Sequence, residues 1–567
     1  MIIFGNASRM ADFHQDPPKL ENTYTGDAPL RALLGRLLPK DVWHTIDAEL
    51  SLLGSRAAGD ILALGDAAEA SPPRHIPFDA WGHRVDRLEI SDAWQKLERI
   101  AAAEGLVALA YERNLDALSR VDQFARVYLF HPSSATVTCP FAMADGAARC
   151  LELHGGSDER LQVMQRHLTS RDQYAFWTSG QWMTERTGGS DVSGTTTVAR
   201  CIDGEWRLYG DKWFTSATTA QMALTLARIE GAKDLSLFAL ETRDSSGTLQ
   251  RIRVNRLKDK LGTRALPTAE LTLDGTPAIL VDGEGHGVKK MAPVLTITRV
   301  WNTFCASSLM RRAVALSVDY ARRRQAFGRR LIDLPLHAET LAAMEVETRG
   351  ATQLGFNIAQ LLGREENGAA TDDERALLRL LVPIAKLMTG KQAVAVASEA
   401  LESFGGAGYI ETTGLPRLLR DAQVLPIWEG TTNVLSLDVL RALGRTDALA
   451  ALRRHVERSR SRLTSKSLID GARLLQEQVQ RLEGHANDIA KDADNAAASA
   501  RDLAMTIGRA YTGTLLLEQA EADAASGSSD ATVVASRWCA TTFSAADRLT
   551  IVDRDLSRSL VEGERTT

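Results

Sequence analysis

The sequence predicts an α+β multidomain protein with an N-terminal α-helical domain, a middle β-barrel or sandwich, a C-terminal four-helix bundle and an extra C-terminal helical region. Two observations carry this prediction. A single hydrophobic core stops growing near roughly 250–300 residues, so a chain of 567 residues divides into several domains. Apolar residues at helical spacing also occur on both sides of a region in which the spacing is that of strands.

The domain boundaries follow these changes of spacing. Residues 1–28 contain Pro17-Pro18 and no periodicity, which indicates an extended arm. Helical spacing predicts a first domain over residues 29–178, where Pro72-Pro73 mark a turn between helices. Short β-rich runs, such as residues 235–240, predict a barrel over residues 179–286. A helical bundle over residues 287–446 follows, and then a tail over residues 447–567 with two long helices separated by Ser526-Gly527-Ser528-Ser529.

The composition is that of an ordinary globular protein, with 44% apolar and 25% charged residues. A formal net charge of -5 gives no overall attraction to nucleic acid. The cysteines lack a CxxC pair and a neighbouring His, so we expect reduced core thiols and no bound metal. They are Cys139, Cys150, Cys201, Cys305 and Cys539.

No uninterrupted apolar run approaches the ~20 residues of a membrane-spanning helix. Residues 1–12 also lack the charged-then-apolar plan of a secretory signal. We therefore expect a cytoplasmic protein without membrane association.

The first chemically informative segment is residues 183–192, MTERTGGSDV. Signatures of hydrolases, zinc enzymes and phosphate-loop proteins are absent from the chain. In this segment Gly188 and Gly189 leave backbone N–H groups unobstructed and hydroxyls lie beside them, which suits a pyrophosphate held without a metal. A turn between strands uses the same residue types, and this alternative stays open.

The second segment is residues 427–433, IWEGTTN, which places Glu429 between an aromatic residue and a glycine. A carboxylate in this position can lie over a flat cofactor, with Trp428 excluding water and with Thr431 and Asn433 binding polar groups nearby. The alternative is an N-terminal cap of the helix that begins near Thr432, because acidic residues favour helix starts.

Taken in order, these segments resemble the motifs of the acyl-CoA dehydrogenase family. The series is completed by residues 212–216 (KWFTS), 322–328 (RRRQAFG), 404–409 (FGGAGY) and 417–421 (RLLRD). The resemblance spans nearly the whole chain. Trp428 in place of the more usual Tyr, and the extra helical tail, are similar to the AidB-like, alkylation-response branch.

The resemblance implies bound FAD and a set of cofactor-binding residues. These are Met183, Thr184, Gly189 and Ser190 at the flavin or its pyrophosphate, Phe214, Thr215 and Ser216 over the isoalloxazine, Arg324 and Phe327 at the FAD of a neighbouring subunit, and Gly405 and Gly406 beside the adenine half. Such shared sites imply a homo-oligomer, a tetramer built as a dimer of dimers.

The implied function is the α,β-dehydrogenation of an acyl-CoA thioester, within fatty acid metabolism. Glu429 matches the general base, and a base in a dry pocket is strengthened by desolvation. Arg299 matches an arginine near that base, with a plain surface arginine as the alternative. Hydride passes to flavin N5, and an electron-transfer flavoprotein or oxygen then accepts the electrons. Thr296 and Pro335 replace family residues that help to bind CoA, so the particular acyl-CoA stays open.

Two other functions remain open. One is a flavoprotein that acts mainly by binding nucleic acid, because Arg454, Arg458 and Arg462 fall on one face of a predicted helix. A solvated helix face is the simpler interpretation of that stripe, and we do not favour nucleic acid as a partner. The other is a regulator that binds an acyl-CoA thioester without turning it over.

Overall fold

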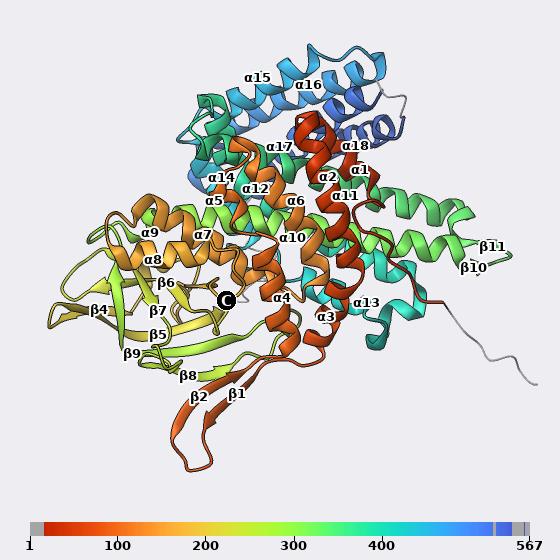
Figure 1. The fold of residues 1–567 in the computed structure, drawn as a ribbon. Helices are drawn as coiled ribbons and strands as arrows, with labels where there is room; N and C mark the ends of the chain where they lie inside the picture. Colours follow the sequence, from red (N-terminus) through yellow and green to blue (C-terminus); the bar gives the residue numbers. More distant parts are fainter. Residues whose placement is uncertain (1–15, 525–528, 547–560, 562–567) are drawn as a thin grey trace, which may run out of the picture.

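The computed structural model describes residues 16–524, 529–546 and 561. Along the described chain a helical domain is followed by a barrel, a helical bundle and a further group of helices. This order confirms the predicted fold class. Figure 1 shows the barrel on one side of the molecule, the long bundle helices across its middle and the last helices above them.

The N-terminal domain is a set of mostly short helices around one core. Its helices are α1 (Ala28–Leu37), α2 (Lys40–Ala58), α3 (Asp60–Glu69), α4 (Asp92–Ala103), α5 (Leu109–Glu112), α6 (Ser119–Phe130), α7 (Thr138–His154) and α8 (Glu159–Leu168). Every residue of α6 is buried. α7 packs closely on the bundle at Gly146, where a Cβ would lie 2.8 Å from Val294. The close approach of α7 to the bundle brings this domain to the candidate site.

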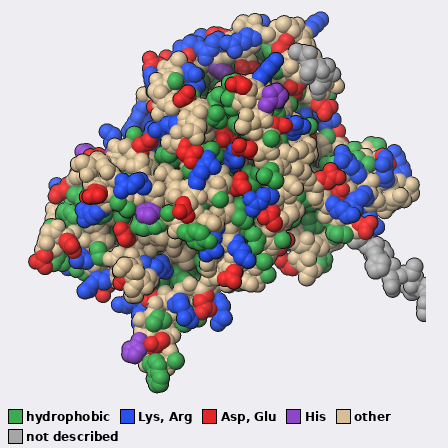
Figure 2. Space-filling model, in the orientation of Figure 1, with side chains coloured by type: hydrophobic (Ala, Val, Ile, Leu, Met, Phe, Trp, Pro, Cys, Tyr) green, Lys and Arg blue, Asp and Glu red, His purple; other side chains and the backbone are tan. Residues whose placement is uncertain are grey.

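The domain also contains a β-hairpin that the helical spacing did not predict. Strands β1 (Arg74–Phe78) and β2 (Arg84–Glu89) pair antiparallel after Pro72-Pro73. The Asp79 carboxylate accepts the backbone N–H of Trp81 and of His83, which reverses the chain. Phe78 and Trp81 are 51% and 86% exposed, and apolar side chains occupy the lower tip in Figure 2.

The middle domain is a closed barrel, as predicted. Its strands are β3 (Ser179–Trp182), β4 (Val198–Ile202), β5 (Glu205–Ser216), β6 (Met222–Ile229), β7 (Leu235–Glu241), β8 (Ile252–Leu257) and β9 (Thr268–Leu280). The order β6-β4-β5-β9-β7 closes because β7 also pairs with β6. β3 and β6, like β4 and β6, run parallel, and the other pairs are antiparallel. The closed ring leaves only β3 and β8 as outer strands.

The bundle consists of long helices that leave the barrel at α9 (Gly287–Lys290). Its helices are α10 (Ala292–Arg323), α11 (Pro335–Glu366), α12 (Asp372–Ser403), α13 (Leu415–Ala422) and α14 (Thr432–Leu443). A small hairpin of β10 (Gln325–Ala326) and β11 (Arg329–Arg330) joins α10 to α11. Within the described residues α12 is the one helix long and apolar enough to span a membrane, and 83% of its most apolar window is buried inside the protein. It is the central helix of the bundle core.

The tail forms four helices rather than the two long ones predicted. They are α15 (Ala448–Arg460), α16 (Lys466–Ile489), α17 (Ala493–Ala524) and α18 (Asp530–Ala546). Of the predicted separator, residues 526–528 lie outside the described residues. α17 packs on α11, α12 and α14, so the tail extends the bundle core.

The cysteines correct one expectation. All five are free thiols, and four are buried as predicted, but Cys201 is exposed on β4. Among the described residues, no group of three or more His, Cys, Asp or Glu side chains is arranged to hold a metal ion.

A buried ionic network joins the N-terminal domain to the bundle. The Arg120 guanidinium of α6 contacts Asp145 of α7 at 2.8 Å and Glu366 of α11 at 2.7 Å. Trp301 of α10 donates to the same Asp145 carboxylate at 2.7 Å. Although burial opposes the charge, the two carboxylates raise the pKa of Arg120 well above its usual value. The network therefore fixes α10 against α7 at the level of the candidate site.

Replacement of Asp145 by Ala leaves the Arg120 guanidinium buried beside a single carboxylate. We expect Asp145→Ala to lower the free energy of unfolding by about 3–5 kcal/mol, because the change breaks one buried ion pair and removes the carboxylate that accepts hydrogen bonds from Gln123 and Trp301. Urea denaturation measures the loss. The control Glu399→Ala, on the exposed face of α12, should change it by less than about 0.5 kcal/mol. Equal stability of the two variants would contradict this role for the network.

Candidate active site

Glu429 lies in a strained turn between α13 and α14, and its side chain points to α10. Its φ is 57° and that of Gly430 is 102°. A non-glycine residue with positive φ is uncommon and is often found at functional sites. The Thr298 hydroxyl donates to the Glu429 carboxylate at 2.7 Å. Thr431, not Glu429, is the N-cap residue of α14, so the alternative that Glu429 caps this helix is wrong.

Arg299 is close to Glu429, and the alternative of a plain surface arginine is wrong. Its side chain is only 15% exposed and pairs with Asp438 of α14 at 2.9 Å. Its Nε donates to the backbone carbonyl of Glu429 at 3.3 Å. One arginine therefore binds both the turn and the helix that follows it.

Trp428 and Asn302 fix the segment before the turn. The Trp428 indole donates to the Asn302 side-chain oxygen at 2.8 Å, and the Asn302 amide donates to the Leu425 carbonyl at 3.0 Å. Trp428 is half-buried against the hydrophobic core. Thr431 and Asn433 are exposed at the start of α14, and the Thr431 side chain makes no capping hydrogen bond. Their polar groups are accessible next to Glu429.

A second cluster lies on the barrel, where the two predicted flavin-binding segments meet. The backbone N–H of Trp213 donates to the Thr184 carbonyl at 2.8 Å. The pairing of β5 with β9 is interrupted between Lys212 and Thr215, so the chain bulges there and Phe214 is 60% exposed with φ 55°. The predicted residues of this cluster are Met183, Thr184, Gly189, Ser190, Phe214, Thr215 and Ser216.

Not all of these side chains face outward. Met183 and Thr215 are buried, and the Thr215 hydroxyl donates to the Ala269 carbonyl. Ser216 hydrogen-bonds Thr268, its neighbour on β9. At this bulge Phe214 and backbone groups therefore present the surface, whereas the hydroxyl of Thr215 stabilises the barrel.

Beneath the second cluster, a buried ion pair anchors its glycine loop. Lys212 is fully buried and contacts Glu185 at 2.8 Å. Glu185 also accepts the hydroxyl groups of Thr196 and Thr197. Burial alone would raise the pKa of Glu185, but Lys212 and these donors hold it below its usual value. The loop over residues 183–197 is thereby fixed to the strand that carries Phe214.

The remaining predicted residues lie at the opposite end of the bundle. Arg324 and Phe327 belong to the β10–β11 hairpin, and Gly405 and Gly406 follow α12. The two segments are neighbours, since the Tyr320 and Phe404 rings that precede them lie 4.9 Å apart. Along α10, the 25 residues from Arg299 to Arg324 span about 37 Å at 1.5 Å per residue.

This third cluster is highly exposed. Phe327, at the hairpin tip, is 93% exposed and has φ 52°, and Tyr409 is 89% exposed. No atom lies within 4 Å of a Cβ placed at Gly405 or Gly406. Figure 2 shows Lys and Arg side chains around this end of the bundle, on the right. The third cluster therefore does not meet the other two within one chain.

The predicted arginine stripe of the tail is corrected by the structure. Arg454 and Arg458 both pair with Asp373 of α12, at 2.7 Å and 3.3 Å. α15 ends at Arg460, so Arg462 lies beyond the helix rather than on its face. Asp373 offsets part of the charge of Arg454 and Arg458, and Arg462 does not share their helix, so the predicted stripe of three arginines on one helix face is not formed.

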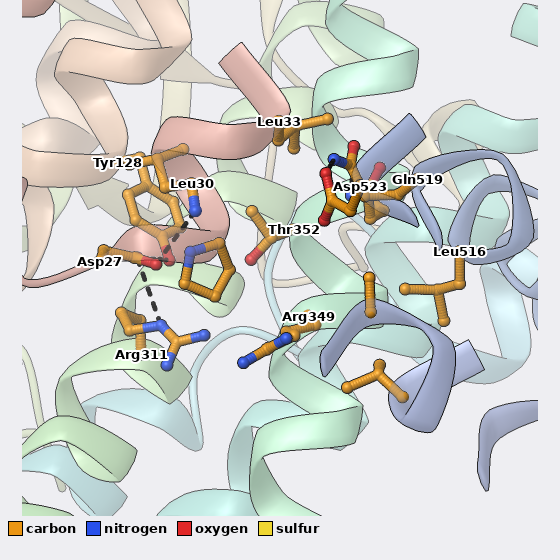
Figure 3. A pocket seen from close by; sticks show the side chains of 14 residues that line it. Asp27, Leu30, Leu33, Tyr128, Arg311, Arg349, Thr352, Leu516, Gln519 and Asp523 are labelled. Carbon is orange, nitrogen blue, oxygen red and sulfur yellow. Dashed lines mark hydrogen bonds and ion pairs between the residues drawn. The ribbon is translucent and has the colours of Figure 1, made fainter. Parts of the chain in front are cut away.

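A cavity of about 30 Å³ lies far from these clusters in the fold, between α1, α10, α11 and the tail (Figure 3). Asp27 and Arg311, which form an ion pair at 3.3 Å, line one side of it. Since one water needs about 10–15 Å³, a cavity of about 30 Å³ admits two or three waters and no dinucleotide or acyl chain. It is a gap with a mixed apolar and polar lining in the packing of the tail against the bundle.

Sequence reasoning missed several residues that bind the turn at Glu429. Thr298 and Asn302 lie on α10, Lys386 on α12 and Asp438 on α14. Thr298 is adjacent to Arg299, and this adjacency was the one feature of the sequence that could have placed Thr298 near Glu429. Lys386 gave none, because a single lysine in a helix has no distinctive spacing.

The chain has a helical domain, a barrel and a bundle in this order, and a carboxylate faces the junction of the bundle and the N-terminal domain. This arrangement defines the class of flavin-dependent acyl-thioester dehydrogenases. Family models match the chain almost throughout. The matches are the adaptive response protein AidB N-terminal domain at residues 15–173, the acyl-CoA dehydrogenase middle domain at 180–276, the acyl-CoA dehydrogenase C-terminal domain at 285–444, and the acyl-CoA dehydrogenase 11 C-terminal domain-like model at 447–561.

Comparison with individual proteins gives the same family as the family models. The chain is 45% identical to acyl-CoA dehydrogenase family member 11 of Caenorhabditis elegans, over 94% of this chain and 89% of that protein. It is 33% identical to the putative acyl-CoA dehydrogenase AidB of Escherichia coli, over 68% and 71%. The crystal structure of C. elegans ACDH-11 in complex with C11-CoA superposes with a TM-score of 0.94 at 41% identity and covers 99% of both chains. The chain belongs to the acyl-CoA dehydrogenase family, in its AidB-like branch.

FAD is the cofactor that membership of this family implies, and the second cluster fits it. The bulge at Phe214 exposes an aromatic face and unpaired backbone beside the glycine loop. A Cβ at Gly189 would lie 2.8 Å from the Thr184 hydroxyl, so the close approach there requires glycine. Three cations lie over the Trp213 ring: Arg186 at 5.0 Å, Lys258 at 3.6 Å and Arg256 at 6.0 Å. Glu270 pairs with Lys258 and Arg256, so the group keeps a net positive charge. An anionic dinucleotide suits this surface.

Replacement of Glu185 tests the anchor beneath the loop. Glu185→Ala leaves the Lys212 ammonium buried without a carboxylate, so we expect a loss of about 3–5 kcal/mol in the free energy of unfolding and a lower FAD content after purification. Chemical denaturation and the visible absorbance measure these effects. Glu205→Ala, which removes an exposed carboxylate at the start of β5, is the control. Full FAD content and stability in Glu185→Ala would refute the anchoring role.

Proposed function

We propose that this protein is an FAD-dependent acyl-CoA dehydrogenase that converts an acyl-CoA thioester to its α,β-unsaturated product, with Glu429 as the general base. One observation carries the proposal: the half-buried Glu429 carboxylate is held by Thr298 at 2.7 Å, in a turn fixed by Arg299. A positioned base in a confined pocket is what abstraction of an α-proton requires.

The chain supplies the acid–base part of this reaction. Glu429 takes the α-proton, and the Thr298 hydroxyl fixes the direction of its carboxylate. The Glu429 backbone N–H has no hydrogen-bond partner within the described part of the chain, so it is available to the thioester oxygen as charge develops there. Trp428 excludes water beside the base. FAD, when bound, supplies the acceptor for the hydride from the β-carbon.

The place of the acyl chain follows from the surroundings of Glu429. Burial raises the pKa of the Cys139 thiol of α7, and the charge of Glu429 adds to this rise. α7 also packs on α10, the helix that carries Thr298 beside the base. An acyl chain that enters here meets the apolar faces of α7 and α10. The complex of ACDH-11 with C11-CoA supports an acyl-CoA ligand of this kind. We propose an electron-transfer flavoprotein as the electron acceptor.

The third cluster supports an oligomer. Phe327 and Arg324 lie about 37 Å along α10 from Arg299, and Phe327 is 93% exposed. Tyr409, in the same cluster, is 89% exposed, and exposed large apolar side chains that lie together are typical of an interaction site. We propose that it contacts the FAD site of a second copy of the chain in a tetramer.

Glu429→Gln removes the base and keeps the side-chain shape and the contact with Thr298. We expect the variant to retain FAD and acyl-CoA binding and to lose at least about 100-fold in the rate of flavin reduction, the scale of general-base catalysis. Anaerobic titration with acyl-CoAs, followed by the visible flavin band, measures it. Glu402→Gln, exposed on α12, should behave as wild type.

The same titration separates dehydrogenation from binding without turnover. If wild type binds acyl-CoA and its flavin band is not bleached at any chain length, the protein is a binding protein and the dehydrogenase proposal is wrong.

Phe327→Asp places a charge at the hairpin tip. We expect the assembly to become smaller and to lose FAD, because a carboxylate in an apolar interface carries a desolvation cost. Sedimentation velocity, recorded by absorbance at the protein and flavin wavelengths, measures the mass of the assembly and its FAD content. Leu52→Asp, at a residue that is 67% exposed in α2, is the matched control. An unchanged mass and FAD content in Phe327→Asp would rule out this interface.

A further inference from the structure

The two carbonyl groups of the Glu429–Gly430 turn are each held by a cation from a different helix. Arg299 Nε of α10 donates to the Glu429 carbonyl at 3.3 Å, and Lys386 Nζ of α12 donates to the Gly430 carbonyl at 2.6 Å. Both residues of the turn have positive φ. Such a conformation persists only where its surroundings hold it in place, and these two contacts are part of that restraint.

Lys386 is an unusual residue for this position. Its side chain is fully buried in the middle of α12. Burial lowers the pKa of Lys386 to about 7, against the attraction of Glu429, and Arg299 adds to the lowering. A buried ammonium makes folding less favourable unless it is well paired. Lys386 therefore makes a contact that an apolar residue of the same size could not make.

We propose that Lys386 is a positioning residue for the general base: through its hydrogen bond to the Gly430 carbonyl it holds the turn that aims Glu429 at the substrate. This inference rests on the proposed function, because it presumes that Glu429 abstracts the proton. Lys386 is fully buried and acts through the backbone of the turn. Arg299 holds the preceding carbonyl, so the turn is restrained from α10 and from α12 together.

The charged groups around Lys386 come from three elements. Glu429 faces it from the turn and Arg299 from α10, and Arg299 is itself paired with Asp438 of α14. Since the folded-state pKa of Lys386 is below the unfolded value of 10.5, its charge destabilises the fold below pH 7. This cost is relieved as the pH rises from about 7 toward 10.5. Lys386→Met removes that cost. If Lys386 only contributed to stability, the variant would therefore be at least as stable as wild type below pH 7 and would keep its rate of flavin reduction.

The test compares Lys386→Met, Lys386→Arg and the control Lys391→Met, which changes an exposed lysine five positions further along α12. The first readout needs no turnover. Amide hydrogen exchange of peptides that cover residues 424–434, in protein without acyl-CoA, should be faster in Lys386→Met than in wild type, and unchanged in Lys391→Met. Peptides from β6 and β7 should exchange equally in all forms. The melting temperature of Lys386→Met at pH 6.5 should equal or exceed that of wild type.

The second readout is flavin reduction by acyl-CoA. We expect Lys386→Met to lower the rate constant at saturating acyl-CoA about 10- to 100-fold, the cost of a misplaced catalytic group, with little change in the Kd of acyl-CoA. Lys386→Arg, which keeps a charged donor, should recover most of the rate.

The two proposals fail in different ways. If exchange over residues 424–434 and the reduction rate are both the same in Lys386→Met and wild type, the positioning role of Lys386 is overturned while the dehydrogenase stands. If wild type itself is not reduced by acyl-CoA, the proposed function fails, and hydrogen exchange alone then decides whether Lys386 holds the turn.

Discussion

The hydrogen bonds from α10 and α12 to the carbonyl groups of Glu429 and Gly430 are the constraint on which the active site depends. The turn is not regular secondary structure, and its positive φ values make it unfavourable in isolation. It is stable because long, buried helices present Arg299 and Lys386 at fixed positions on its two sides. The direction of the Glu429 carboxylate then follows from one further contact, the hydroxyl of Thr298.

The helices that hold the turn are themselves fixed by contacts outside the site. Asp145 binds Arg120 and Trp301 and so sets α10 against the N-terminal domain. The tail packs on α12 and α14 from the other side. The tail thus belongs to the same core as the bundle and packs on the helices that carry the site.

The glycine loop of the barrel, like the Glu429 turn, is held in place by buried side chains. The Lys212–Glu185 pair, buried below the surface, fixes a glycine loop, and an interrupted strand pairing turns Phe214 outward beside it. In both places a strained or irregular backbone is held by a buried lysine, Lys386 at the turn and Lys212 at the barrel. The irregular backbone presents the reactive or binding groups, and the contacts of the buried lysine keep it in one conformation.

Local sequence patterns predicted much of the fold. The change from helical to alternating spacing located the barrel, and the return of helical spacing located the bundle, because a period of 3.6 or 2 reflects which face of an element is buried. The same logic failed at β1–β2, where a projecting hairpin with little buried surface leaves no period to read. It also failed at Arg462, because α15 ends two residues earlier.

By itself the sequence determined the domain order, the family and the short motifs in which Glu429, Arg299 and the glycine loop occur, since these are properties of neighbouring residues. Only the tertiary structure decided which distant residues meet. Thr298, Asn302 and Lys386 are ordinary helix residues whose importance arises from the packing of α10 and α12 around one turn. It also separated Arg324 and Phe327 from Glu429, because a continuous helix holds its two ends apart.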